Sequence, residues 1–343
     1  MRTWRSLAVV AVGLSVGLAA ALGMAPQQRV TIKLATLAPD GSPWHRILKD
    51  MGHEWQRDTQ GRVRLVIYPG GIAGDGRSML RKIRLGTLQG AALTVSGMSE
   101  LDPAFNVFQI PLFFDSIDEF FYVLEQMSPL LKERLESRGF VVLQWGYGGW
   151  MHIFAKRPIQ TVEELKRLKM FTGAGDDRMI RLWRSNGFSP VALSQTDIMM
   201  GLQSGMIDGI PIPPLAALAT QWYKHIPYMI EPGVTPLVGA TVVDAEAWVK
   251  ISERDRAALL AAARRAEKRL AAEIPAKDKE SIVEMEERGL EVIRVRAGHQ
   301  EDPWRATAES FARSMRTALV PDEVFDLAVR FRSDFRESRA GGG

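Results

Sequence analysis

Apolar and polar positions along the first third of the chain predict strands and helices in turn. Residues 30–34 alternate between apolar and polar side chains, as a half-buried strand does, and apolar residues in 44–55 recur at helical spacing. The pattern continues with a strand, a helix and a strand, over 63–68, 76–85 and 91–95. This strand–helix–strand order predicts a mostly parallel α/β sheet.

The same order restarts near residue 140. Strands are expected over 140–145, 169–172, 190–193 and 238–243, and helices over 162–168, 176–186 and 195–204. A second α/β unit of this kind predicts two lobes. A small molecule would bind in the cleft between them.

A long charged segment over 253–288 is expected to be helical, with Pro275 inside it and Gly289 as its stop. Because proline lacks the amide hydrogen that a helix interior uses, we expect a kink or a break at this position. Two more helices are expected over 303–318 and 321–336.

The N-terminal residues 1–25 have the pattern of a secretory signal peptide. Arg2 and Arg5 make the start positive, residues 7–22 form an uncharged apolar run, and Gly23-Met24-Ala25 provides a small-x-small cleavage site. The alternative is an uncleaved anchor, for which this run is short. Since the chain has no cysteine, a lipid-modified N-terminal cysteine is excluded. We expect a mature protein that is free in the periplasm.

Charge and motifs exclude several classes of function. The 44 Lys and Arg residues nearly balance the 40 Asp and Glu residues, so no basic patch for nucleic acid is expected. The five histidines form no zinc motif, and no nucleophile elbow or phosphate-binding loop is present. We therefore expect no catalytic residue, no metal site and no cofactor. A secreted enzyme remains a minor alternative.

Aromatic residues gather at or after predicted strand ends in the second unit, and these are candidates for a pocket wall. They are Trp145, Tyr147, Trp150, Phe154 and Phe171, with Trp222 on a later segment. Burial in the core is the competing interpretation for each. Trp150 and Phe171 lie at junctions that would edge a cleft between lobes.

Several blocks, in this order and spacing, carry a resemblance to a known family. They are Leu37–Trp44, Gly61–Val63 before Tyr68-Pro69, Leu85–Ala91, Ile110–Phe114, Lys156–Thr161, Leu165–Lys169 and Gly201–Gly209. Over about residues 29–300 the chain resembles the DctP-like extracytoplasmic substrate-binding proteins of TRAP transporters. The resemblance implies a two-lobed α/β periplasmic binding protein fold with hinge strands and a long kinked helix that braces both lobes. Such proteins are not enzymes: they close on a ligand and deliver it to a sodium-coupled membrane partner.

The same resemblance implies boundaries for each part of the chain. Lobe 1 is expected over 29–147 plus 235–250, and lobe 2 over 148–234 plus 289–300. The bridging helix would span 251–288, and C-terminal helices and a tail would fill 301–343.

The chain departs from the family where typical members hold a carboxylate. An arginine that follows the Leu165–Lys169 block and forks onto the substrate is replaced by Phe171. A second arginine position is Trp150, and two asparagine positions are Phe154 and Ile212. Each charge-assisted hydrogen bond to a carboxylate contributes about 1.5–3 kcal/mol, so losing a bidentate clamp weakens such a ligand by at least about a hundredfold.

We therefore expect a small ligand that is uncharged, hydrophobic or amphipathic. The expected contacts are Trp44, Ser96, Met98, Trp145, Tyr147, Trp150, Phe154, Phe171, Thr172, Ile212 and Trp222. Arg178 and Arg181 are candidates for a replacement cation, which would permit a carboxylate after all. The expected partners are TRAP membrane subunits. The other hypothesis is a carrier of lipid-like molecules that feeds no transporter and works with a periplasmic helical-repeat protein.

Overall fold

The computed structural model describes residues 29–295 and 302–341. The expected signal peptide lies outside the described residues. The strands are β1 (Val30–Thr36), β2 (Val63–Tyr68), β3 (Gly90–Thr94), β4 (Phe140–Ala155), β5 (Lys169–Gly173), β6 (Ser189–Leu193), β7 (Gly209–Ile212), β8 (Tyr228–Asp244) and β9 (Glu291–Arg294). The helices are α1 (Pro43–Asp58), α2 (Gly76–Arg84), α3 (Val95–Ser99), α4 (Ile117–Glu136), α5 (Val162–Lys166), α6 (Asp177–Ser185), α7 (Ile198–Ser204), α8 (Pro214–Ala219), α9 (Ala245–Trp248), α10 (Glu253–Glu286), α11 (Pro303–Met315) and α12 (Asp322–Ala340).

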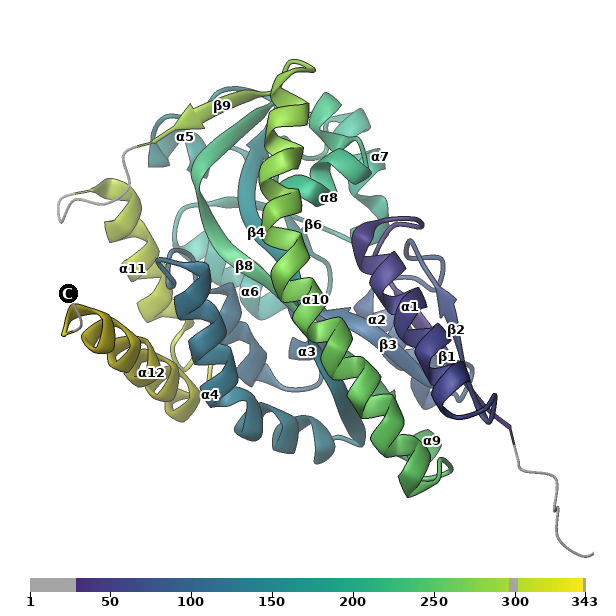
Figure 1. Cartoon of the computed structure of the whole chain (residues 1–343). Helices are drawn as coiled ribbons and strands as arrows, with labels where there is room; N and C mark the ends of the chain where they lie inside the picture. The colour runs from purple at the N-terminus through teal and green to yellow at the C-terminus, as the bar shows by residue number, and fades with distance from the viewer. Residues whose placement is uncertain (1–28, 296–301, 342–343) are drawn as a thin grey trace, which may run out of the picture.

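All nine strands belong to one mixed sheet, in the order β2-β1-β3-β8-β4-β7-β5-β6, with β9 beside β8. At one end β1 pairs in parallel with β2 and β3, and at the other end β5 pairs in parallel with β6 and β7. The two ends are joined by β4 and β8, which are 16 and 17 residues long and run antiparallel through both halves (Figure 1). The expected two-lobed α/β fold with hinge strands is confirmed.

Both hinge strands are longer than the sequence pattern predicts. The prediction ended β4 at residue 145, but the strand continues through Gly146, Gly148 and Gly149 to Ala155. The prediction began β8 at 238, although it starts ten residues earlier, before Pro232 and Pro236. Glycine and proline weaken the alternating pattern of a strand and mark irregular positions in it, and the β4–β8 register does shift between Tyr147 and Trp150.

The long helix α10 is anchored to both lobes and to β4. It continues through Pro275 as one helix (Figure 1), so of the two expected outcomes, a kink or a break, the break does not occur. Near its start, Asp255 pairs with Arg62 beside β2 at 2.7 Å. Further along, the Glu267 carboxylate accepts the N–H of Trp145 at 3.0 Å.

The Asp278 carboxylate of α10 bridges β4 and α8. It accepts the N–H of Trp150 and the N–H of Leu215, each at 3.0 Å. Gly149 packs against this carboxylate with a φ of +115°, and a side chain there would collide with Asp278 and with Pro213. A third lobe-spanning element therefore reinforces the two hinge strands.

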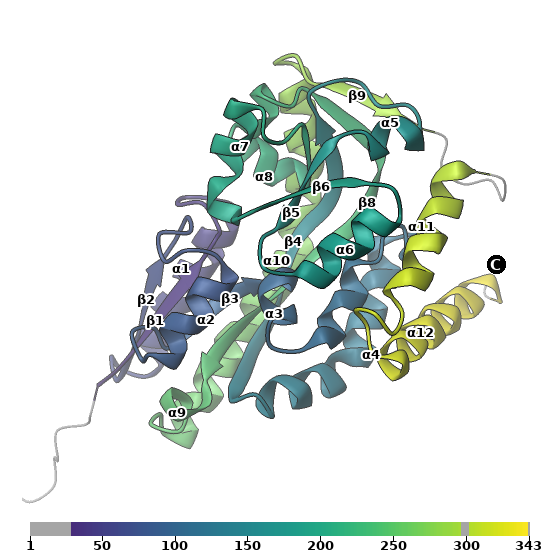
Figure 2. The same ribbon diagram turned by 180° about the vertical axis from the view of Figure 1, so that it is seen from behind.

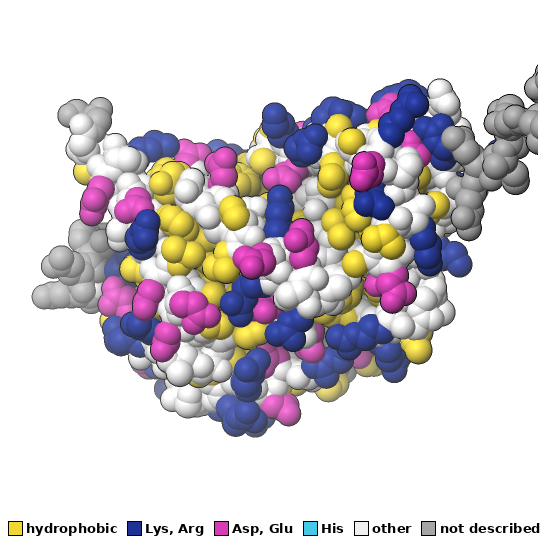
Figure 3. All heavy atoms as spheres, turned by 90° about the horizontal axis from the view of Figure 1, so that it is seen from below, with side chains coloured by type: hydrophobic (Ala, Val, Ile, Leu, Met, Phe, Trp, Pro, Cys, Tyr) yellow, Lys and Arg dark blue, Asp and Glu magenta, His cyan; other side chains and the backbone are white. Residues whose placement is uncertain are grey.

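Six elements were not part of the sequence prediction: α3, α4, β7, α8, α9 and β9. The helix α4 covers the first lobe and is joined by the C-terminal helix α12 (Figures 1 and 2). There Arg336 forks onto the buried Glu119 at 2.5 and 3.3 Å. On the face seen in Figure 3, acidic and basic side chains are interspersed with hydrophobic ones.

Candidate ligand-binding site

A cavity of about 760 Å³ lies between the two lobes, within the usual size range for small-molecule sites. Its lining comes from lobe 1 (36–39, Trp44, 70–72, 92–96), from lobe 2 (170–173, Gln195, Thr196, Ile198, 210–213, Trp222) and from the shared strands (Gln144, 146–148, Met151, Ile153, 234–235, 237–241). Residues of α5, α6, α8 and α11 also line it, as do Leu48, Gln109, Pro111, Leu112, Phe188, Thr220 and Leu270. Both lobes and both hinge strands would therefore contact a molecule bound there.

None of the described residues that line this cavity is Asp, Glu, Lys, Arg or His. Most of the wall is aliphatic or aromatic. Burial keeps the Tyr147 hydroxyl protonated by raising its pKa well above the usual value, and the nearby Asp278 adds to this effect. The lining therefore offers hydrogen bonds and apolar surface, but no formal charge.

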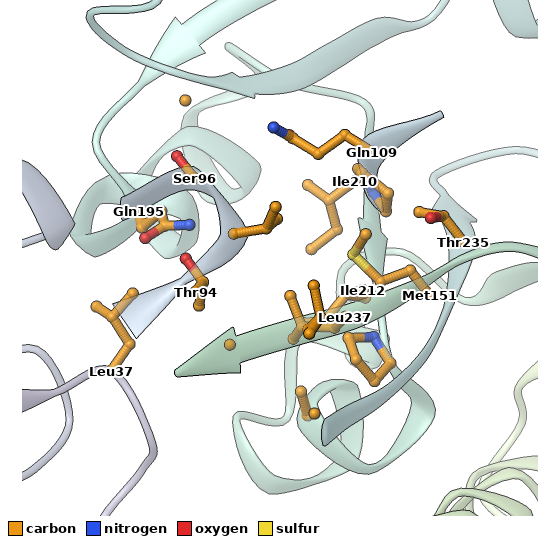
Figure 4. A pocket seen from close by; sticks show the side chains of 18 of the residues that line it. Leu37, Thr94, Ser96, Gln109, Met151, Gln195, Ile210, Ile212, Thr235 and Leu237 are labelled. Atoms are coloured by element: carbon orange, nitrogen blue, oxygen red, sulfur yellow. The ribbon is translucent and has the colours of Figure 1, made fainter. Parts of the chain in front are cut away.

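Polar side chains gather on two sides of the cavity (Figure 4). Thr94, Ser96 and Gln195 lie near one another on one side, and Gln109 and Thr235 lie on the other. Between them the wall consists of apolar side chains, those of Met151, Ile210, Ile212 and Leu237. The distribution of polar groups in the cavity is uneven.

The polar side chains on the two sides of the cavity differ in whether they already have hydrogen-bond partners in the protein. The Gln109 amide donates to Asn106, and the Thr235 hydroxyl donates to the carbonyl of Phe108. In contrast, the buried Thr94 hydroxyl has no hydrogen-bond partner among the described residues. The same is true of two other buried atoms of lining residues, Gln144 Oε1 and Trp44 Nε1. Since buried polar atoms are almost always paired in native proteins, these three are suited to pair with a ligand.

Charged residues do lie at the edge of the cleft, where the lobes touch. Arg77 of α2 donates to the carbonyl of Gly175 in the other lobe at 2.7 Å and also pairs with Glu100. Ser194 donates to Asp75 across the same edge at 3.2 Å. Burial opposes ionisation of Asp75, but hydrogen bonds from Ser78 and Ser194 and the charge of Arg77 outweigh it, so the pKa of Asp75 is lowered. We call Asp75, Arg77, Glu100, Gly175 and Ser194 the rim latch.

The structure brings seven of the sequence-predicted contacts to the cavity. They are Trp44, Ser96, Tyr147, Phe171, Thr172, Ile212 and Trp222. Among them are Phe171 and Ile212, which occupy the positions of a carboxylate-binding arginine and an asparagine in typical members. Their contact with a ligand stays a prediction, but their place on the wall is suitable for it.

Four other predicted contacts do not line the cavity, and their assignment to the site is corrected. Along β4, the cavity is lined by Gln144, Gly146, Gly148, Met151 and Ile153, and also by Tyr147. Trp145 and Phe154 lie next to residues of the first group, so they point to the opposite face of the pleated strand. Trp145 donates instead to Ser128 at 2.8 Å, and Phe154 is fully buried in the lobe 2 core.

Trp150 and Met98 also lie outside the cavity, each for its own reason. The register shift after Tyr147 turns Trp150 away from the cavity, where its indole packs on Gly233 while Met151 lines the wall. Met98 is fully buried in the lobe 1 core, although Ser96 on the same short helix reaches the cavity. The predicted wall of Trp150, Phe154 and Phe171 is therefore wrong for its first two members.

The candidate replacement cations are also outside the cavity. Arg178 and Arg181 are exposed on α6, whereas Met179 and Trp183 of the same helix line the cavity. The two arginines therefore lie on a different face of α6 from the two residues that line the cavity. Neither arginine is placed to bind a carboxylate inside the cavity.

Several lining residues escaped the sequence analysis. Gln144 has a recognisable signal, because it is a polar residue inside an otherwise apolar run of residues from 140 to 145. Residues of α11 carried no signal: only tertiary packing brings that helix to the cavity wall.

Among the described residues, no group of acidic or histidine side chains is arranged to hold a metal ion. No helix in that part of the chain is long and apolar enough to cross a bilayer.

Comparison with known proteins gives partial matches to curated sequences. The chain is 24% identical to the uncharacterized protein YiiZ of Salmonella typhimurium, over 52% of this chain and 55% of that protein. It is also 24% identical to the 2,3-diketo-L-gulonate-binding periplasmic protein YiaO of Escherichia coli, over 73% of this chain and 76% of that protein. The alignments thus span between about half and three quarters of these relatives.

The fold is matched over nearly the whole length of solved structures. One is a TRAP periplasmic solute-binding protein from Xanthobacter autotrophicus with bound β-D-galacturonate, which superposes with a TM-score of 0.80 at 18% identity. The match covers 88% of this chain and 99% of that one. Residues 34–317 also match the model of the DctP family, described as bacterial extracellular solute-binding protein, family 7. The chain therefore belongs to family 7 of the bacterial extracellular solute-binding proteins, the DctP-like receptors of TRAP transporters, which bind solutes and are not enzymes.

Proposed function

We propose that this protein is a periplasmic receptor that captures an uncharged, hydrophobic or amphipathic small molecule between its lobes and delivers it to TRAP membrane subunits. The observation that carries the proposal is the cavity lining, in which no described residue bears a charge. An ionised carboxylate buried there would lose its hydration without gaining a cationic partner, which is strongly unfavourable.

Apolar contacts supply the opposite preference. Burying about 200 Å² of apolar ligand surface against this wall contributes roughly 5 kcal/mol at 25 cal/mol/Å². Phe171 and Ile212 contribute to this surface in positions where the resemblance leads us to expect an arginine and an asparagine. The galacturonate seen in the Xanthobacter protein is an acidic sugar. We infer that the present cavity has a different specificity from that protein.

Binding would be coupled to movement of the lobes. We propose that lobe 1 comprises 29–147 with 235–250, that lobe 2 comprises 148–234 with 289–300, and that β4 and β8 flex between them. A ligand that contacts both lobes favours the closed arrangement by its difference in affinity for the two states. The rim latch would add contacts to that closed state only.

We also propose that the N-terminal 25 residues act as a signal peptide, which directs export and is then cleaved. A second candidate function, a carrier of lipid-like molecules that works with a helical-repeat protein in place of a transporter, is supported by the same apolar lining. Co-purification of the membrane subunits or of such a repeat protein with this receptor distinguishes the two functions.

The test is a competition experiment. N-phenyl-1-naphthylamine, an uncharged fluorescent probe, is expected to bind the purified mature protein with micromolar affinity. Millimolar galacturonate, succinate or sialic acid is expected not to displace it. Micromolar binding of any of these acids, measured directly by calorimetry, would overturn the proposal.

A further inference from the structure

The cavity is not confined to the interface between the lobes, because α11, the helix before α12, forms part of its wall. Trp304, Thr307, Ala308 and Phe311 of this helix line it. The neighbouring lining residues are apolar: Val162 and Leu165 of α5, Met170 of β5, and Met179 and Trp183 of α6. Figure 2 shows α11 next to α6, on the far side of α6 from the lobe 1 strands. We call this part of the cavity the α11 compartment.

An aromatic cluster closes the α11 compartment. The Phe311 ring meets Trp183 edge-on with ring centres 5.6 Å apart, and meets Phe188 edge-on at 6.0 Å. Ala308 lies one turn before Phe311, is 7% exposed, and is the smallest side chain that α11 contributes to the wall. The compartment therefore presents mainly carbon surface, and the polar atoms that α11 brings to it are the Thr307 hydroxyl and the Trp304 indole nitrogen.

The polar end of the cavity has the opposite character. Thr94 and Ser96 of lobe 1 and Gln195 of lobe 2 lie together there (Figure 4). Within the described chain the buried Thr94 hydroxyl is unpartnered, and no hydrogen bond engages the Ser96 hydroxyl or the Gln195 amide. These groups donate and accept hydrogen bonds but carry no charge.

We propose that the cavity has a head site at Thr94, Ser96 and Gln195 and a tail site in the α11 compartment, so that the ligand is an elongated neutral amphiphile with a hydroxyl or amide head and an alkyl tail. This inference rests on the proposed function and deepens it. The head is held by groups from both lobes, so it promotes closure. The tail extends to α11 and determines the preferred chain length.

Straight-chain 1-alkanols of six to twelve carbons test the tail site, because they combine one hydroxyl with a tail of chosen length. Affinity is measured by displacement of N-phenyl-1-naphthylamine, with alkanoates of equal length as charged counterparts. We expect the alkanol affinity to rise about fourfold for each added methylene, until the compartment is full. Each alkanoate should bind more weakly than the matching alkanol.

Substitutions on α11 locate the limit in chain length. Ala308→Trp fills the compartment and should move the limit to shorter chains, whereas Ala306→Trp, at an exposed position of the same helix, should leave it unchanged. Phe311→Ala enlarges the compartment and should move the limit to longer chains. If Ala308→Trp does not fold, Ala308→Leu and Phe311→Ala still provide opposite shifts.

The outcomes separate this inference from the proposed function. If alkanols bind but their affinity does not depend on chain length, or if the α11 variants behave like the wild type, the proposed tail site is wrong. The proposed function, a receptor for a neutral ligand, is then unaffected. If no alkanol displaces the probe while galacturonate binds, both are wrong.

Discussion

The cavity wall and the places where structural elements meet use charge in opposite ways. No described residue of the wall is charged, yet the rim latch a short distance away contains Asp75, Arg77 and Glu100. The helix α10 likewise holds β4 with the carboxylates of the half-buried Glu267 and the buried Asp278. Charges therefore join the parts of this receptor, and apolar surface is left for the ligand. The difference indicates that direct contacts between the structural elements and specificity for the ligand depend on separate residues.

The largest expected effect comes from placing a charge in the wall. Phe171→Arg should weaken binding of a neutral probe by more than about 4 kcal/mol, because an unpaired guanidinium loses its hydration in an apolar site. Carboxylate binding should not be restored, since Ile212 provides no second polar group. Calorimetry with the neutral probe and with galacturonate measures both effects. Micromolar galacturonate binding by the variant would contradict this view of the wall.

Removing the Phe171 ring without adding a charge separates the loss of apolar contact from the effect of a buried charge. Phe171→Ala should weaken the same probe by about 2–4 kcal/mol, by analogy with truncation of buried aromatic residues. The unfolding midpoint of the empty protein should fall less, because Phe171 is only partly buried. If affinity is unchanged and stability falls as for a core residue, Phe171 belongs to the core and not to the ligand site.

The Asp278 carboxyl of α10 predicts a pH dependence of the stability of the folded protein. Burial raises the pKa of Asp278 to about 6, against the lowering effect of the N–H groups of Leu215 and Trp150, whereas an unfolded aspartate titrates near 3.8. The folded state therefore gains a proton first as pH falls. This contribution to stability is fully present below pH 3.8 and is lost as pH rises through about 6.

The stability of the wild type relative to Asp278→Asn should therefore fall by roughly 2.4 kcal/mol between pH 4 and pH 7, at 1.36 kcal/mol per pKa unit. Urea unfolding at several pH values measures this change. Glu286→Gln, at an exposed position of the same helix, is the control and should follow the wild type. A pH-independent difference for Asp278→Asn would show that burial does not govern this carboxyl.

The smallest expected effect is at the rim. Arg77→Ala removes one contact between the lobes and a partly exposed ion pair, so ligand affinity should fall by about 1 kcal/mol or less. The loss should appear mainly as faster dissociation in stopped-flow measurements. A loss as large as that of Phe171→Ala would mean that the rim, and not the wall, controls binding.

The sequence predicted the lobes better than the site. Periodicity located β1 and α1 because their apolar faces are regular, whereas α10 was predicted as a long charged segment ending at Gly289. The family motifs indicated the two-lobed arrangement. Phe171 and Ile212 were found through their departure from the family pattern. Trp150 and Phe154 were misplaced because a register shift and the alternation of β4 decide which side chains face the cavity, and neither is visible from spacing. The wall from α11 arises from tertiary packing alone.

The most direct test of the central claim is native mass spectrometry of the protein purified from its periplasm, followed by extraction and identification of any bound molecule. The account predicts a co-purified neutral amphiphile that is lost when Phe171 is replaced by Arg. A sugar acid or a dicarboxylate released from the wild-type protein would contradict it.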